Sequence, residues 1–252
     1  MMAQAARPQI ARDLTAADLT HALAAGWRDF ISAPLFGLFF GGIYVAAGIG
    51  LYFLAFVKGE VALLIPAAAG FPLLAPFVAV GLYEVSRRRE QTQPLRWSAI
   101  LGAIRGRGDG QLWLMGGIVF VGFSFWVIIA HTIFAIFVAG SPAGESLAFL
   151  ATQEGIAMLI VGGAVGAGIA FIFYAITLMS LPMLVDRDVD FITAIITSFG
   201  AIGANTGVLM SWAVIIAVAL FIAMLPLFLG LLVVLPVLGH ATWHLYRRVV
   251  KG

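Results

Sequence analysis

The sequence predicts an all-α, polytopic membrane protein: a helical bundle of six transmembrane helices arranged as three hairpins, each preceded by a short interfacial amphipathic helix. Three observations lead to this fold class. The composition is 62% hydrophobic and 10% charged, well beyond the roughly 45–50% apolar content of ordinary soluble domains. Several apolar stretches reach the ~20 residues that cross a ~30 Å hydrocarbon core. Of the 14 basic residues, all but Lys58 can lie on one side of the membrane.

Five apolar blocks mark the spans, and the last block is long enough for two. The first four blocks are Leu35–Val57, Val61–Tyr83, Leu112–Val138 and Ile156–Met183. In the fifth block, residues 207–242, Pro226 and Gly230 can turn a tight hairpin. It therefore divides into two short spans, Val208–Leu225 and Leu227–Leu245, with one long helix over residues 207–245 as the open alternative.

The charge distribution decides between five and six spans. With six spans and both termini cytoplasmic, the external loops hold only Lys58. Five spans would instead expose Arg247, Arg248 and Lys251 outside, against the positive-inside rule. The basic loop "VSRRREQTQPLRWSAILGAIRGRG" (residues 85–108) could in principle bind nucleic acid or acidic lipid headgroups. Its composition is, however, the one expected of an inner loop, and we expect no nucleic-acid partner. No signal peptide is recognisable in residues 1–34.

A threefold pattern organises the chain. An amphipathic segment precedes each odd-numbered span, and the first and third segments share "DFISA" (residues 29–33) and "DFITA" (residues 190–194). We therefore expect repeat units of about 14–84, 95–183 and 188–246. Residues 1–34 form a cytoplasmic N-terminal segment with an amphipathic helix, and residues 35–248 form a single six-span membrane domain. In the third segment, apolar residues share one helical stripe: Ile192, Ile195, Ile196, Phe199 and Ile202.

Two features inside the spans have both a structural and a functional interpretation. Small residues at four-residue spacing allow close helix packing, within the chain or in a homo-oligomer; they are Gly42, Ala46, Gly50 and Gly162, Gly166, Ala170. A broken helix is where transporters bind substrate, and the second span carries the residues that would break it, Pro66, Gly70, Pro72 and Pro76. Proline is also simply commoner in membrane helices than in soluble ones.

Few ionisable residues lie near the spans. Glu84 is expected to pair with Arg87 or Arg88, three and four residues further on. His240 and His244 share a helix face and are weak candidates for a metal site, although "HATWHLYRR" also fits an aromatic and basic belt that ends a span. No cysteine is present, and no nucleophile with a nearby base is recognisable. We expect no cofactor, no metal and no catalytic residue, so the protein is not expected to be an enzyme.

Three aspartates, Asp186, Asp188 and Asp190, are concentrated in the link "DRDVD" before the third amphipathic segment. They could bind a divalent cation if the link is extended. The simpler interpretation is that Asp188 or Asp190 caps the following helix. Asp186 would then pair with a guanidinium of the loop over residues 87–107.

The segment "SLPMLVDRDVDFITAIITSFGAIGANTGVLMSW" resembles a bacterial family of predicted integral membrane proteins, the domain of unknown function 2189 family. The residues that carry the resemblance are Pro182, Met183, Asp186, Arg187, Asp188, Ala194, Ile195, Thr197, Ser198, Asn205 and Trp212. Because "DFISAPLFGLFFGGIYVAAG" is similar to the family's first span, the resemblance covers the chain from about Leu19 onward. Thr206 stands where the family usually has proline. The resemblance implies the fold and a bacterial inner-membrane location, and it assigns no catalytic residue.

These observations favour a non-enzymatic accessory, assembly or structural subunit of a larger inner-membrane complex, or a homo-oligomer. The alternative is a transporter or channel for a small apolar or amphiphilic solute. The expected partners are the lipid bilayer and either that complex or further copies of the chain. The motif residues, including Asp190, are expected to act as helix caps and unit links rather than as an active site.

Overall fold

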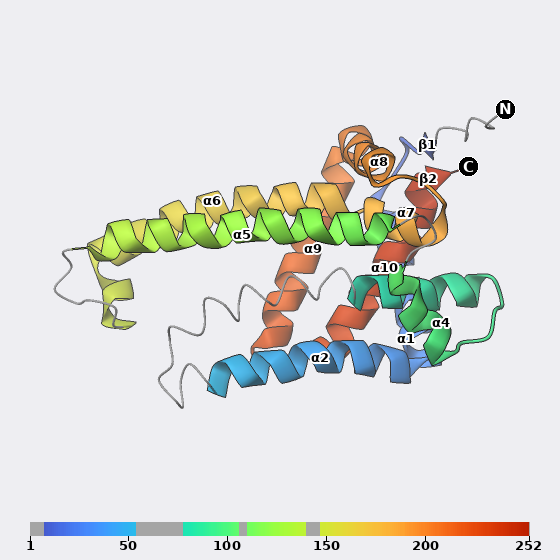
Figure 1. Ribbon diagram of the computed structural model, residues 1–252, viewed down its shortest axis with the longest axis horizontal. Helices are drawn as coiled ribbons and strands as arrows, with labels where there is room; N and C mark the ends of the chain where they lie inside the picture. The colour runs from blue at the N-terminus through green and yellow to red at the C-terminus, as the bar shows by residue number, and fades with distance from the viewer. Residues whose placement is uncertain (1–7, 54–77, 106–109, 140–146, 252) are drawn as a thin grey trace.

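The computed structural model describes residues 8–53, 78–105, 110–139 and 147–251, and this part of the chain is almost entirely helical (Figure 1). Its elements in chain order are β1 (Gln9–Ile10), α1 (Ala16–Ser32), α2 (Pro34–Tyr52), a helix over residues 78–90, α4 (Trp97–Gly102), η3 (Ala103–Arg105), α5 (Gln111–Val138), η4 (Leu147–Ala151), α6 (Gln153–Thr177), α7 (Ser180–Asp186), α8 (Phe191–Ala204), α9 (Thr206–Met224), α10 (Leu231–Val249) and β2 (Val250–Lys251). The predicted all-α class is confirmed, and the two-residue strands β1 and β2 pair antiparallel.

Four helices in these ranges are long and apolar enough to cross a membrane: Pro34–Tyr52, Gln111–Val138, Gln153–Asp186 and Thr206–Met224. They correspond to the first, third, fourth and fifth predicted spans. The second predicted span lies mostly in residues 54–77, outside the described residues. The sixth corresponds to α10, which is not among the four and carries two histidines and two arginines in its C-terminal half. Six spans therefore stay a prediction.

The long apolar block over residues 207–245 forms two helices rather than one, as the predicted hairpin requires. Helix α9 ends at Met224 and α10 begins at Leu231. The turn between them places Leu227 and Phe228 at φ of 49° and 65°. A Cβ atom on Gly230 would lie 2.6 Å from the Ala223 carbonyl oxygen. Only glycine therefore lets the start of α10 lie this close to the end of α9.

Helix α10 is the element around which one end of the molecule is packed. It runs along α1 so closely that a Cβ atom on Gly26 would lie 2.6 Å from the Val237 carbonyl oxygen. Its aromatic residues Trp243 and Tyr246 are fully buried. They join a core that includes Met115 of α5, Met183 of α7 and Trp212 of α9. Because these large side chains of α10 are buried against several other helices, α10 belongs to the core of the bundle rather than to its periphery.

The short helices α1, α4 and α8 lie at the same end of the molecule as both chain termini, and the α5–α6 hairpin extends away from that end (Figure 1). Each short helix precedes one of the apolar helices α2, α5 and α9, in the order that the threefold pattern predicts. Each also exposes large apolar side chains: Trp27 and Ile31, Trp97 and Leu101, Ile192, Ile196 and Phe199. Such faces suit the membrane interface, and that placement stays a prediction.

Helix α8 packs against the rest of the protein with its small and polar side chains, which a soluble protein would expose to water. Its buried side chains include the small or polar residues Ala194, Ser198 and Ala201, whereas Ile196 is 65% exposed. The predicted apolar stripe is therefore largely turned outward, apart from Ile202, which is buried. An outward apolar face and an inward polar one are expected where the surroundings are apolar.

Candidate functional site

The richest group of polar contacts surrounds the C-terminal half of α10, and we call it the α10 cluster. It consists of Asp29, Ser86, Arg89, Glu90, Asp186, His240, Trp243, His244, Tyr246 and Arg247. Asp29 lies on α1, Asp186 ends α7, and Ser86, Arg89 and Glu90 lie on the helix over residues 78–90. The cluster therefore joins four helices that are distant in sequence.

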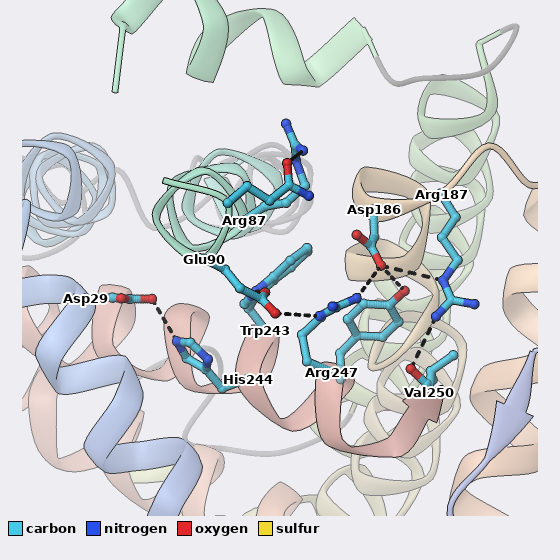
Figure 2. A network of polar contacts seen from close by, with 11 residues as sticks. Asp29, Arg87, Glu90, Asp186, Arg187, Trp243, His244, Arg247 and Val250 are labelled. Carbon is cyan, nitrogen blue, oxygen red and sulfur yellow. Dashed lines mark hydrogen bonds and ion pairs between the residues drawn. The ribbon is translucent and has the colours of Figure 1, made fainter. Parts of the chain in front are cut away.

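Arg247 forms the centre of one half of the cluster. Figure 2 shows its guanidinium between two carboxylates, with Nε 3.1 Å from Glu90 Oε1 and Nη1 3.0 Å from Asp186 Oδ2. The Tyr246 hydroxyl also donates to Asp186 Oδ2 at 2.9 Å, and the Trp243 indole N–H donates to Glu90 at 3.2 Å. Donors of α10 thus hold both carboxylates. Hydrogen bonds to a charged group are stronger than those between two neutral groups.

Asp29 forms the centre of the other half. Its Oδ2 lies 2.8 Å from His244 Nε2, and its Oδ1 accepts a hydrogen bond of 2.8 Å from Arg89 Nε. Only 6% of Asp29 is exposed. Burial alone would raise the pKa of its carboxyl, but the hydrogen bonds from His244, Ser86 and Arg89 outweigh burial and lower that pKa to about 2. Asp29 is therefore ionised, and its hydrogen bonds connect α1 with α10 and with the helix over residues 78–90.

The fully buried His240 is paired with the helix over residues 78–90. Its Nδ1 lies 2.8 Å from the Ser86 hydroxyl oxygen, within hydrogen-bond distance. Among the described residues the other ring nitrogen, Nε2, has no partner. His240 and His244 thus have separate partners, and the described ranges contain no group of three metal-ligating side chains.

Glu84 pairs with both arginines that follow it, as predicted. Its carboxylate accepts hydrogen bonds of 2.7 Å from Nε and Nη2 of Arg87 and a bond of 2.6 Å from Nε of Arg88. Nη1 of Arg87 donates to Gln91 and Nη1 of Arg88 to the Pro94 carbonyl. Glu84 is buried and fully engaged, so it is a structural carboxylate.

The three aspartates of the acidic link have separate environments. Asp190 caps α8, since its Oδ1 accepts a hydrogen bond of 2.8 Å from the Thr193 N–H, and its bonds with Thr193 lower the pKa of its carboxyl. Asp188 is exposed. Asp186 was expected to pair with an arginine of residues 87–107, but none of the arginines described in residues 87–105 reaches it; α10 packs beside α7 and brings Arg247 to Asp186 instead. The described geometry does not support a cation site made of all three.

The remaining motif residues hold the turns around α8. Arg187 donates to the Val250 carbonyl at 3.3 Å, and Pro182 is buried in α7. The buried Ser198 hydroxyl accepts a hydrogen bond of 3.1 Å from the Met179 N–H. Asn205, between α8 and α9, donates from Nδ2 to the Ala11 carbonyl at 2.7 Å and accepts from the Leu14 N–H at 3.3 Å. These contacts fasten the N-terminal segment to the α8–α9 corner.

The two predicted small-residue stripes have different surroundings. On α2, the stripe Gly42, Ala46, Gly50 faces away from the other described helices, and a Cβ atom on either glycine would meet none of the residues that the structure describes within 4 Å. On α6, Gly166 faces α5, where its Cβ atom would lie 3.1 Å from the Trp126 ring, and Gly162 faces Ile133 at 3.9 Å. Ala170 is exposed. The proposed broken-helix residues, Pro66, Gly70, Pro72 and Pro76, lie outside the described residues.

Two hollows accompany these elements. A groove of about 790 Å³ runs between the α5–α6 hairpin and the helices behind it, where Tyr83, Ile216 and Thr242 line the wall opposite α6. A smaller pocket of about 290 Å³ lies beside the Glu84–Arg87–Arg88 group and is closed by α4, η3 and Val185. The groove lies within the range of roughly 300–1,000 Å³ typical of ligand sites.

The α10 cluster as a whole was not anticipated. The signal that could have found it is the density of hydrogen-bonding side chains in "HATWHLYRR" (residues 240–248), in a chain that is otherwise strongly apolar. An interfacial belt needs aromatic and basic residues but no acidic partners. The partners Asp29, Glu90 and Asp186 come from three separate parts of the chain, so their convergence is a property of the fold.

Comparison with known proteins finds a family model that is similar to the central part of the chain. Residues 64–186 match the family model described as predicted integral membrane protein (DUF2189). This confirms the resemblance noticed in the sequence, over a shorter stretch than the one expected from Leu19 onward. The match ends at Asp186, so the motif residues from Arg187 to Trp212 lie beyond it. No curated protein and no solved structure matches the chain.

Proposed function

We propose, from the match of residues 64–186 to a family of predicted integral membrane proteins, that this chain is a non-enzymatic accessory or assembly subunit of a larger complex in a bacterial inner membrane. In this proposal the chain spans the membrane six times, and both termini are cytoplasmic, together with α1, α4 and α8. The distribution of basic residues supports this orientation. The observation that carries the subunit role is the outward small-residue stripe of α2.

Helix α2 uses its glycines on two faces. On the inner face, a Cβ atom on Gly41 would lie 3.0 Å from the Leu231 carbonyl oxygen, and one on Gly48 would lie 2.6 Å from the Phe228 ring. On the outer face, a Cβ atom on Gly42 or Gly50 would meet no described residue within 4 Å. Membrane helices associate through small residues that let two backbones approach closely. A second protein, or a second copy of this chain, can therefore pack on the outer face as α10 packs on the inner one.

The α10 cluster supports a structural role rather than a catalytic one. Its carboxylates Asp29, Glu90 and Asp186 each bind donors from a neighbouring helix. These interactions hold the elements of the chain together at one end. A general acid or base needs instead a group that is free to reach a substrate.

A transporter or channel for a small apolar or amphiphilic solute is the second candidate, because of the groove beside the α5–α6 hairpin. Reconstitution of the protein into vesicles with a fluorescent phospholipid in one leaflet tests it. Transport predicts faster exchange between leaflets than in protein-free vesicles, and equal rates would reject this candidate.

The subunit role is tested by gentle extraction at native expression, with cross-linking and size-exclusion chromatography. We expect the wild-type chain to elute with a partner protein or as an oligomer, and the Gly42→Leu, Gly50→Leu double variant to elute alone. Gly117→Leu is the matched control, since a Cβ atom on Gly117 would also be more than 4 Å from every described neighbour, but Gly117 lies on α5. Elution of the wild-type chain as a lone monomer would contradict the proposal.

A further inference from the structure

The groove and the smaller pocket are consecutive along the same helices. On the helix over residues 78–90, Ala79 and Tyr83 line the groove, and Arg87, one turn further on the same face, lines the pocket. On α7 the same step leads from Leu181 in the groove to Val185 in the pocket. One elongated depression therefore passes from an apolar part to a charged part.

The apolar part offers almost no polar group to a ligand. The hydroxyl groups of Thr177 and Thr242 donate to carbonyls of their own helices, those of Phe173 and Leu238, at 2.7 and 2.8 Å. The Tyr174 hydroxyl donates to the Leu209 carbonyl. Because these three hydroxyls are already satisfied, the wall presents mainly hydrocarbon to an occupant, with the Tyr83 hydroxyl and the Trp126 indole N–H as its other polar groups. Such a wall suits an alkyl chain better than a polar solute.

The length and direction of the groove also fit an alkyl chain. It follows α6 from Gly162 to Leu178, a distance of about 24 Å at the helical rise of about 1.5 Å per residue. Half of the hydrocarbon core of a bilayer is about 15 Å thick. The groove is therefore long enough to hold an entire acyl chain of one leaflet. The charged pocket is at the end where α4, α7 and the chain termini gather (Figure 1).

The charged part carries one net positive charge. Two guanidinium groups, of Arg87 and Arg88, face the single carboxylate of Glu84. The hydrogen bonds of this group engage Arg87 through Nε, Nη1 and Nη2 but Arg88 only through Nε and Nη1. Among the described residues Nη2 of Arg88 has no hydrogen-bond partner, so it is the donor best placed for an anion, and a planar guanidinium suits a phosphate group.

We propose that the depression binds one anionic phospholipid, with an acyl chain in the groove along α6 and its phosphate beside Arg88. This inference does not depend on the subunit role proposed above. It requires only a chain embedded in a bilayer, where such lipids surround it. Charge complementarity selects the anionic headgroup, since the pocket is the charged end of an otherwise apolar depression.

The test uses the full chain in nanodiscs that contain equal amounts of phosphatidylglycerol and phosphatidylcholine, followed by extraction and native mass spectrometry. We expect the wild type to retain one phosphatidylglycerol about fivefold more often than phosphatidylcholine, the effect of about one basic residue near a lipid headgroup. Arg88→Gln should abolish this preference, while Glu84 keeps both bonds to Arg87. Arg28→Gln, which removes an exposed charge on α1, should leave it unchanged.

A second pair of variants tests the groove and leaves the charged pocket unchanged. One variant fills the groove, and the other is its control on the same helix. Gly163 and Gly168 both lie on α6, and in the described part of the chain a Cβ atom on either would meet nothing within 4 Å, but only Gly163 of the two lines the groove. Gly163→Phe should lose most of the retained lipid, and Gly168→Phe should retain it. Equal lipid retention by these two variants would overturn the proposal. So would equal retention of the two lipids by the wild type, or a protein found in the groove in place of lipid.

Discussion

Replacement of Gly26 by alanine should destabilise the protein, because the added methyl group has no room between α1 and α10. The added Cβ atom would lie 2.6 Å from the Val237 carbonyl oxygen and 2.6 Å from the Ala241 amide nitrogen. Both atoms belong to the α10 backbone, so the two helices must move apart. Overpacking of this kind costs about 1–3 kcal/mol, against a gain of about 1 kcal/mol in helix propensity for glycine to alanine. The net loss at the upper end is about 2 kcal/mol.

Thermal unfolding in one fixed detergent measures this loss, with fluorescence of the buried Trp243 as a reporter of α10. At about 2–4 °C per kcal/mol for a chain of this size, Gly26→Ala should lower Tm by about 4–8 °C. Gly117→Ala, on α5, places its Cβ atom where no described side chain or backbone lies within 4 Å, so it should instead raise Tm slightly. If both variants melt alike, α1 and α10 are not in the close contact described here.

Three further predictions concern the aspartates. Asp186→Asn should lower the free energy of unfolding by about 1–2 kcal/mol, since its ionic bond to Arg247 is only partly shielded, and a double-mutant cycle with Arg247→Gln should show coupling rather than additivity. The pKa of Asp29 is about 2 when folded, against 3.8 ordinarily, so its charge stabilises the fold above about pH 4 and this contribution, about 2 kcal/mol, is lost between about pH 4 and 2. Acid unfolding curves of Asp29→Asn should lack that loss. In melting experiments Asp190→Ala should cost about 1 kcal/mol as a lost cap, whereas Asp188→Ala should change little, and equal effects would argue against the assigned cap.

Local patterns in the sequence were sufficient for the helical elements. The break between α9 and α10 follows from Pro226 and Gly230, because a proline and a glycine in an apolar block interrupt helix locally. The bonds of Glu84 with Arg87 and Arg88 follow from helical spacing alone. The cap at Asp190 follows from its place just before a helix. In each case the interacting groups are no more than four or five residues apart.

The candidate site depends on pairings that no local pattern contains. Asp29 and His244 are 215 residues apart, and Asp186 and Arg247 are 61 apart. Which helix packs beside α7 decides the partner of Asp186, and that choice is made by the whole bundle. The same holds for α2, since spacing identified a glycine stripe but could not indicate that a different face contacts α10. Long-range contacts of this kind are visible only in the folded chain.

The contact between α1 and α10 also sets an order of events during synthesis. Gly26 and Asp29 emerge from the ribosome long before their partners Ala241 and His244 exist. At about 5–20 residues per second, the 215 residues between Asp29 and His244 take roughly 10–40 s to make. Throughout that interval α1 lacks the surface that buries it, and Asp29 lacks its imidazole partner. The nascent chain therefore passes through a state in which one face of α1 is uncovered, and this face is buried only after α10 has been synthesised.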